Sequence, residues 1–145
     1  MLKFNKAASK QEIIDIFEHN IDAFTDTPDF NWTLDEIQLE VKDDWELYSV
    51  TTRDEIIAAL FLKEQQDTLL SKNTAIKINF QGSGFSHQIK EFFEKEAKKR
   101  KLKKILHYCR IDNFRMYSLN ESHEYSKTKN TLGDGQIIEW EKKLK

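Results

Sequence analysis

The segment of this sequence with the clearest chemical potential is a glycine loop, Gln81-Gly82-Ser83-Gly84-Phe85-Ser86. It follows a run of strand-forming residues and precedes a segment with helical periodicity. The first amides of a helix lack intrahelical acceptors and carry partial positive charge, and glycine lets an anion approach the backbone closely. The loop therefore predicts a cradle for a phosphate or pyrophosphate group. A plain strand-to-helix turn is the alternative that these residues leave open.

Two well-known phosphate motifs do not fit this loop. No Gly-Lys-Ser/Thr follows it, as a P-loop requires, and His87 stands where a dinucleotide-binding fingerprint needs its third glycine. The predicted cradle therefore belongs to another class of phosphate site.

Four side chains on the predicted strands and on the short helix are candidates for chemistry. His107 alternates with Cys109 on a predicted strand, Tyr117 lies on the short helix that follows, and Glu64 lies near a strand end. A histidine can act as a base, a tyrosine as an acid and a carboxylate as a base. For each there is a structural alternative: a packed histidine, a core aromatic and a solvated carboxylate. Cys109 lacks the flanking motif of a nucleophile, so we interpret it as a small buried residue.

The elements that must position these groups can be read from caps and periodicity. Ser9 with Glu12, and Thr33 with Glu36, form the capping-box pattern that begins a helix. Strand formers at 45–50 and 56–62, separated by polar residues, predict an antiparallel hairpin, and a third extended stretch runs over about 68–77.

The half of the chain after the loop begins with a strongly periodic segment. Its predicted apolar face comprises Phe85, Ile89, Phe92, Phe93 and Ala97. Its predicted solvent face comprises Lys90, Glu91, Glu94, Lys95, Lys98 and Lys99. A strand at 105–111, a short helix to about residue 123, and one or two strands ending at 137–140 behind Gly133-Asp134-Gly135 complete the pattern. We expect an α/β fold of the α+β type, with a central mixed, mostly antiparallel sheet and helices on both faces.

Composition narrows the class of protein. The 145 residues are 39% hydrophobic and 33% charged, with a formal net charge of -2, and we find no repeat or linker. We therefore expect one domain over 1–145, with neither nucleic acid nor a membrane as partner. The single cysteine and the absence of an apolar leader indicate a cytoplasmic setting. The basic run at 98–104 is interpreted as a solvated helix end. We expect no metal.

The loop and its surroundings resemble a known superfamily. Residues 74–84, Thr-Ala-Ile-Lys-Ile-Asn-Phe-Gln-Gly-Ser-Gly, look like the GNAT (N-acetyltransferase) signature of a strand, an aromatic residue and Gln/Arg-x-x-Gly-x-Gly/Ala. Asn113 follows a strand as the asparagine of that superfamily does, and residues 119–125 are similar to a segment that usually ends in Gly-Phe. The order of elements matches over nearly the whole chain.

This resemblance implies an acyltransferase in which a primary amine attacks the thioester of acetyl-CoA directly, in a ternary complex. The acceptor would be a small-molecule or peptide amine. The resemblance is also compatible with a homodimer. The implied CoA-binding residues are Ile76, Lys77, Ile78, Gln81, Gly82, Ser83, Gly84, Phe85, Ser86, Asn113 and Asn120. The lysines of the basic run are a secondary candidate for its phosphates.

The sequence departs from the GNAT pattern at informative positions. Ser86 replaces a second Gly or Ala, and Glu124-Tyr125 replaces the usual Gly-Phe. Asn120 stands where many of these enzymes carry a tyrosine that protonates the departing CoA thiolate, and an amide cannot do this. Tyr117, one helical turn earlier, and His107 are therefore the other catalytic candidates. Asn120 also keeps open the alternative of a catalytically silent CoA-binding module.

Overall fold

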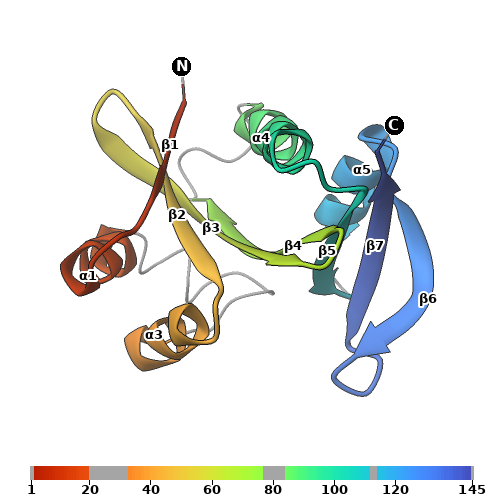
Figure 1. The fold of residues 1–145 in the computed structure, drawn as a ribbon, viewed down its shortest axis with the longest axis horizontal. Coiled ribbons are helices and arrows are strands. Elements are labelled where there is room, and N and C mark those ends of the chain that lie inside the picture. Colours follow the sequence, from red (N-terminus) through yellow and green to blue (C-terminus); the bar gives the residue numbers. More distant parts are fainter. Residues whose placement is uncertain (1, 20–32, 77–83, 112–113, 145) are drawn as a thin grey trace. The chain divides into compact units, whose positions relative to one another are not determined.

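The computed structural model describes residues 2–19, 33–76, 84–111 and 114–144 (Figure 1). Its contacts group the chain into two compact units, residues 1–63 with 73–81, and residues 64–72 with 82–145. A single domain over 1–145 remains a prediction. No helix within the described ranges combines the length and apolar character needed to cross a membrane.

The first unit is built on an antiparallel hairpin that the sequence predicted. Its elements are β1 (Lys3–Lys6), α1 (Lys10–His19), α3 (Leu34–Lys42), β2 (Glu46–Thr52) and most of β3 (Glu55–Gln65). Arg53 and Asp54 join β2 to β3 with positive φ angles of 52° and 65°, the backbone that suits a tight hairpin turn. The core of this unit includes Ile13, Ile16, Ile37, Leu47, Val50, Ile57, Leu60 and Phe61.

The capping box predicted at Thr33 is present in full, whereas at Ser9 only one half is present, because the Glu12 carboxylate accepts from the Ala8 N–H and the Ser9 hydroxyl instead of the Ser9 N–H. The Glu36 N–H donates to Thr33 Oγ1 at 3.2 Å while the Thr33 N–H donates to Glu36 Oε1 at 3.3 Å. At the start of α1 the Glu12 N–H donates to Ser9 Oγ at 3.2 Å. These bonds satisfy amides that a helix start otherwise leaves without partners, which explains why the two helices begin where the sequence indicates.

The second unit carries the glycine-initiated helix and the strands beside it. Its elements are the first residues of β4 (Thr68–Ile76), then α4 (Phe85–Lys99), β5 (Lys104–Arg110), α5 (Phe114–Ser122), β6 (Ser126–Leu132) and β7 (Ile137–Lys143). Its buried side chains include Leu69, Ile89, Phe93, Ala97, Ile105, Cys109 and Trp140. Of the one or two final strands that the sequence predicted, the structure has two, β6 and β7, which pair antiparallel.

The seven strands follow the order β1-β2-β3-β4-β5-β7-β6. The pairing of β4 with β5 is parallel, and it runs in register from Thr68 opposite Lys104 to Lys72 opposite Tyr108. The pairings of β1 with β2, β2 with β3, β5 with β7 and β6 with β7 are antiparallel. The predicted α/β class with a mixed, mostly antiparallel sheet is confirmed.

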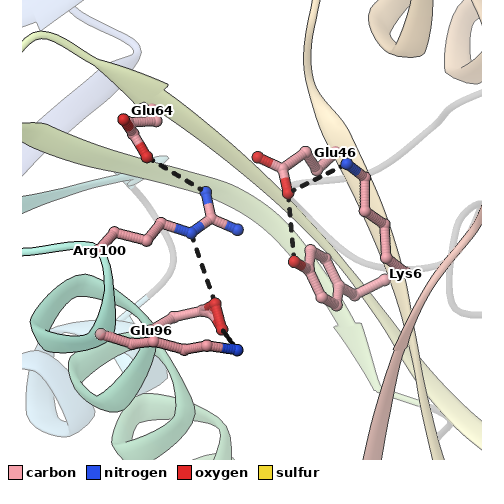
Figure 2. Close-up of polar contacts among 7 residues, drawn as sticks. Lys6, Glu46, Glu64, Glu96 and Arg100 are labelled. Atoms are coloured by element: carbon pink, nitrogen blue, oxygen red, sulfur yellow. Dashed lines mark hydrogen bonds and ion pairs between the residues drawn. The ribbon is translucent and has the colours of Figure 1, made fainter.

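The basic run at 98–104, which begins in the last turn of α4, forms several ion pairs within the second unit. Arg100 lies 3.4 Å from a Glu96 carboxylate oxygen and 3.8 Å from one of Glu64 (Figure 2). Lys103 pairs with Asp67 at 3.7 Å and Lys104 with Glu141 at 3.4 Å. In the first unit, Figure 2 shows a separate contact between Lys6 and Glu46. Surface ion pairs of this kind each contribute little stability. The pair with Arg100, however, engages the carboxylate of Glu64, one of the base candidates.

Candidate active site

The start of α4 has the geometry of an anion cradle. Gly84, its N-cap, has φ 82° and ψ -2°, a left-handed backbone that glycine adopts without steric cost. Among the described residues other than its chain neighbours, none places an atom within 4 Å of a Cβ built on Gly84. No side chain caps this end of α4, and its first turn contains no acidic residue. Backbone amides, partial positive charge and open space therefore coincide at one point, which suits a phosphate group.

The structure describes the predicted cradle at its helical end. Phe85 and Ser86 are the first two residues of α4 and are half-buried, while Ile76 is the last residue of β4. The other predicted cofactor-binding residues lie outside the described ranges; they are Lys77, Ile78, Gln81, Gly82, Ser83 and Asn113. Their roles remain predictions.

Asn120 is completely buried on α5, with an exposed fraction of 0%. Neither its amide nitrogen nor its amide oxygen has a hydrogen-bond partner among the described residues. Leaving buried polar atoms unpartnered costs about 1–3 kcal/mol each, so proteins rarely do so unless the group binds something. By the GNAT resemblance, this position is the one where many of these enzymes carry a tyrosine that protonates the CoA thiolate. Here it holds a buried amide whose nitrogen and oxygen have no hydrogen-bond partner among the described residues.

The Tyr117 hydroxyl is already engaged. It donates to the backbone oxygen of Ile111 at 2.7 Å. The ring packs edge-on against Phe114 and Trp140, with centroid separations of 5.5 and 5.3 Å, and the Lys127 ammonium lies 4.4 Å from its centroid. To act as an acid, Tyr117 must release its bond to Ile111, so the contacts support the structural alternative. Its catalytic role remains a prediction.

A Tyr117→Phe variant tests this assignment. Because the ring contacts are kept and one hydrogen bond is lost, we expect the free energy of unfolding to fall by about 1 kcal/mol. The melting temperature should fall by roughly 2–4 °C, as measured by calorimetry. We expect turnover of acetyl-CoA to stay within about twofold of wild type at equal folded concentration. The reason is that the Tyr117 hydroxyl proton is already held in the hydrogen bond to the Ile111 carbonyl. A drop of more than about tenfold with unchanged cofactor affinity would identify Tyr117 as the acid.

His107 is buried in the second unit, with an exposed fraction of 1%. Its Nδ1 lies 2.8 Å from Ser71 Oγ, and the Ser71 hydroxyl donates to the backbone oxygen of Leu106 at 3.2 Å. We therefore assign the Nδ1 proton as the donor to Ser71. Burial, with a smaller contribution from the charge of Lys90, holds the pKa of His107 well below its ordinary value. A neutral, bonded imidazole fits the structural alternative better than a base, and its catalytic role stays a prediction.

Lys90 corrects the predicted faces of α4. The sequence pattern placed it on the solvent face, but its exposed fraction is 1% and its ammonium nitrogen has no hydrogen-bond partner among the described residues. That nitrogen lies 4.3 Å from the Tyr125 ring centroid and 5.8 Å from that of Phe93. A signal existed in the spacing, because Lys90 precedes Phe93 by three residues and Ala97 by seven, which is one helical stripe.

Burial changes the acid-base properties of Lys90. Loss of hydration lowers the pKa of its amine from 10.5 to about 7, and this outweighs the attraction of Cys109 and Glu94, while Lys142 lowers the pKa further. The Lys90 amine can therefore both donate and accept a proton close to neutral pH. None of the catalytic candidates predicted from the sequence offers this property in the interior of the second unit.

A histidine pair is the second feature that the sequence did not reveal. His87 Nδ1 lies 2.8 Å from His123 Nε2, with the rings 5.0 Å apart. This contact joins the first turn of α4 to the residue after α5. Partial burial, then the proximity of His87, lowers the pKa of His123. Within the described ranges, no group of three or more His, Cys, Asp or Glu side chains is arranged to hold a metal ion.

The fold is shared with acetyltransferases of known structure. The ribosomal-protein-S18-alanine N-acetyltransferase of Escherichia coli has a TM-score of 0.80 and 14% identity, covering 99% of this chain and 94% of its own. A Bacillus subtilis acetyltransferase in complex with CoA has a TM-score of 0.72 and 17% identity, with 99% of each chain covered. A GNAT family acetyltransferase from Elizabethkingia anophelis with acetyl-CoA bound has a TM-score of 0.70 and 16% identity, covering 99% and 98%.

These likenesses establish the GNAT fold for this chain. No protein-family model and no curated protein sequence matches it. At such low identities the structural likeness concerns the fold alone, and function has to be argued from the site.

Proposed function

We propose that this protein is a GNAT-type N-acetyltransferase that transfers the acetyl group of acetyl-CoA to a primary amine. The observation that carries the proposal is the start of α4. There a left-handed glycine with open space at its Cβ position begins an uncapped helix in a chain with the acetyltransferase fold. Acetyl-CoA is then a substrate whose pyrophosphate would lie against the backbone amides at this helix start.

In the proposed reaction the neutral amine attacks the thioester carbonyl carbon, a C–N bond forms and the C–S bond breaks. The amine nitrogen loses a proton and the CoA sulfur gains one, so each proton needs a carrier. Gly84, Phe85 and Ser86 are proposed to hold the phosphates, together with Gln81 to Ser83 of the same loop. Ile76, Lys77 and Ile78 would bind the pantetheine arm. Asn113, which follows the next strand, and Asn120 on α5 would also contact the cofactor.

The acceptor is proposed to be a small-molecule or peptide amine. Among the structural neighbours are ribosomal-protein-alanine N-acetyltransferases, from Escherichia coli and from Brucella melitensis. A peptide that begins with alanine is therefore a reasonable first probe beside simple diamines. A cytoplasmic location and a homodimer remain predictions.

The first test is a thermal-shift titration with acetyl-CoA. A ligand that binds only the folded state stabilises it by about 2.7 kcal/mol at a hundredfold excess over its Kd. For a chain of this size we expect the melting temperature to rise by roughly 5–10 °C. Turnover is then followed by release of the free CoA thiol, with an alanine-starting peptide and a diamine as acceptors. The absence of any shift at millimolar acetyl-CoA would contradict the proposal.

A catalytically silent CoA-binding module is the second candidate. It is favoured by one observation, the buried amide of Asn120 in place of a titratable hydroxyl. This alternative predicts the same thermal shift but no acetylated product with either acceptor between pH 6 and 9.5. The turnover assay therefore decides between the two.

A further inference from the structure

Asn120 is connected through Tyr125 to a titratable residue, Lys90. Asn120 accepts a hydrogen bond at its backbone oxygen from the Tyr125 N–H at 2.9 Å. The ring of Tyr125 is itself the surface on which the Lys90 ammonium rests, 4.3 Å from the ring centroid. Tyr125 is thus a direct neighbour of both residues, and all three belong to the second unit.

These three side chains share an unusual property. Lys90 Nζ, both amide atoms of Asn120 and the Tyr125 hydroxyl are buried without hydrogen-bond partners among the described residues. The exposed fractions of the three residues are 1%, 0% and 3%. Buried polar groups are normally satisfied, and a buried ammonium without a partner is especially unfavourable. The backbone hydrogen bond joins Asn120 to Tyr125 and the ring contact joins Tyr125 to Lys90, so these unsatisfied groups belong to three adjoining residues. We interpret them as a place where polar atoms of a ligand complete the hydrogen bonding.

We propose that Lys90 donates the proton that the CoA sulfur takes up as the thioester breaks, a task that the Asn120 amide cannot perform because its N–H protons are not acidic. This inference rests on the proposed acetyltransferase function. The electron pair of the C–S bond passes to sulfur, the sulfur takes a proton from the Lys90 ammonium, and CoA leaves as the thiol. The Lys90 amine is then reprotonated by solvent, which receives the proton lost by the acceptor amine. No further reactant is needed.

The charges around Lys90 suit this role. Glu94 on the same helix and Cys109 on β5 favour its protonated form, while Lys142 on β7 disfavours it. His107 on β5 lies in the field of Lys90 and is neutral, and His123 after α5 also interacts with it. The Tyr125 hydroxyl has a pKa raised by burial and then by Glu94, so it stays protonated. With a pKa of about 7, Lys90 is therefore the group of this cluster that changes charge near neutrality and can give up a proton.

The decisive variant is Lys90→Met, which keeps the length of the side chain and removes the proton. Lys95→Met is the matched control, because Lys95 lies on the same helix and is exposed. Positioned acid catalysis contributes about 10²–10⁴-fold, so we expect kcat to fall by about 100-fold or more in Lys90→Met. The Kd for acetyl-CoA should stay within about threefold of wild type. Lys95→Met should match wild type in both quantities.

The pH profile separates proton donation from a structural effect. Dividing the wild-type kcat by that of Lys90→Met cancels the ionisation of the acceptor amine, which is common to both proteins. We expect this ratio to be large and constant below pH 7 and to decline tenfold per pH unit above it, as Lys90 loses its proton. A structural defect would give a ratio independent of pH.

A charge without a donatable proton provides the last control. Arginine stays protonated throughout the range, so Lys90→Arg should also lose most of its kcat if the proton matters. Wild-type kcat in Lys90→Arg, or in Lys90→Met, would overturn the role of Lys90 while leaving the acetyltransferase proposal intact. If wild type binds acetyl-CoA but yields no product, both proposals fall. Should Lys90→Met not fold, Lys90→Gln carries the same expectation.

Discussion

A Gly84→Val variant is expected to lose the rise in melting temperature that acetyl-CoA causes in the wild-type protein. Apart from the chain neighbours of Gly84, no described residue places an atom within 4 Å of a Cβ built on it, and we propose this space for the pyrophosphate. A branched side chain fills it and prevents the phosphates from reaching the amides of the α4 start. We expect the Kd for acetyl-CoA to rise by at least 100-fold, measured by calorimetric titration and by thermal shift.

Gly135→Val is a matched control for this variant. Gly135 lies in the turn between β6 and β7, has φ 85° against 82° for Gly84, and likewise has no atom within 4 Å of a built Cβ. Both substitutions force a side chain into the left-handed region, at a cost of roughly 1–2 kcal/mol. The two variants should therefore lose similar stability, but only Gly84→Val should lose acetyl-CoA binding. If Gly84→Val shows a normal shift, the cradle does not lie at this glycine.

Lys90→Met is expected to be more stable than the wild-type protein at pH 7. The Lys90 amine has a pKa of about 7 when folded against 10.5 as an ordinary amine, so between these values the unfolded chain binds a proton that the folded chain does not. Stability therefore rises with pH across this interval, and the burial penalty is present in full below pH 7. Each pH unit corresponds to about 1.4 kcal/mol, so the interval corresponds to at most about 5 kcal/mol.

The measurement is urea unfolding of both proteins between pH 6 and 10. The difference in stability between Lys90→Met and wild type should be largest at pH 6–7 and should shrink steadily towards pH 10. Lys95→Met, with an exposed lysine on the same helix, should follow wild type throughout. A Lys90→Met protein that is less stable than wild type at pH 7 would mean that Lys90 is paired in solution, contrary to the structure.

Several features of this protein were predictable because they depend on neighbours in the sequence. At Ser9 and Thr33 a side-chain hydroxyl accepts from the amide three residues later, so the chain carries its own helix starts. The β2–β3 hairpin was marked by two strand-forming runs around a polar turn, and it occurs as expected. Gly84 is followed by a periodic segment, and it does begin α4 in a left-handed conformation.

The interpretation of individual side chains was less complete where distant segments meet. Tyr117 was a candidate acid, but its hydroxyl donates to the backbone oxygen of Ile111 at 2.7 Å, and its ring packs against Trp140 of the distant strand β7. His87 and His123 are separated by 36 residues and lie within hydrogen-bonding distance. A sequence pattern cannot predict such a pair, because the contact depends on how α4 and α5 pack in the folded protein.

The sequence by itself determined the order of the elements, the helix starts and the glycine that caps α4, because caps, periodicity and backbone freedom act over a few residues. Only the tertiary structure decided the environment of Lys90. A lysine between Ile89 and Glu91 fits a solvent face by composition, yet it is buried and its ammonium lies against the rings of Phe93 and Tyr125. Hydration free energy, and with it the pKa, depends on all the surfaces that exclude water from the amine. Those surfaces come from segments distant in the chain, which explains why this proton donor emerges only from the fold.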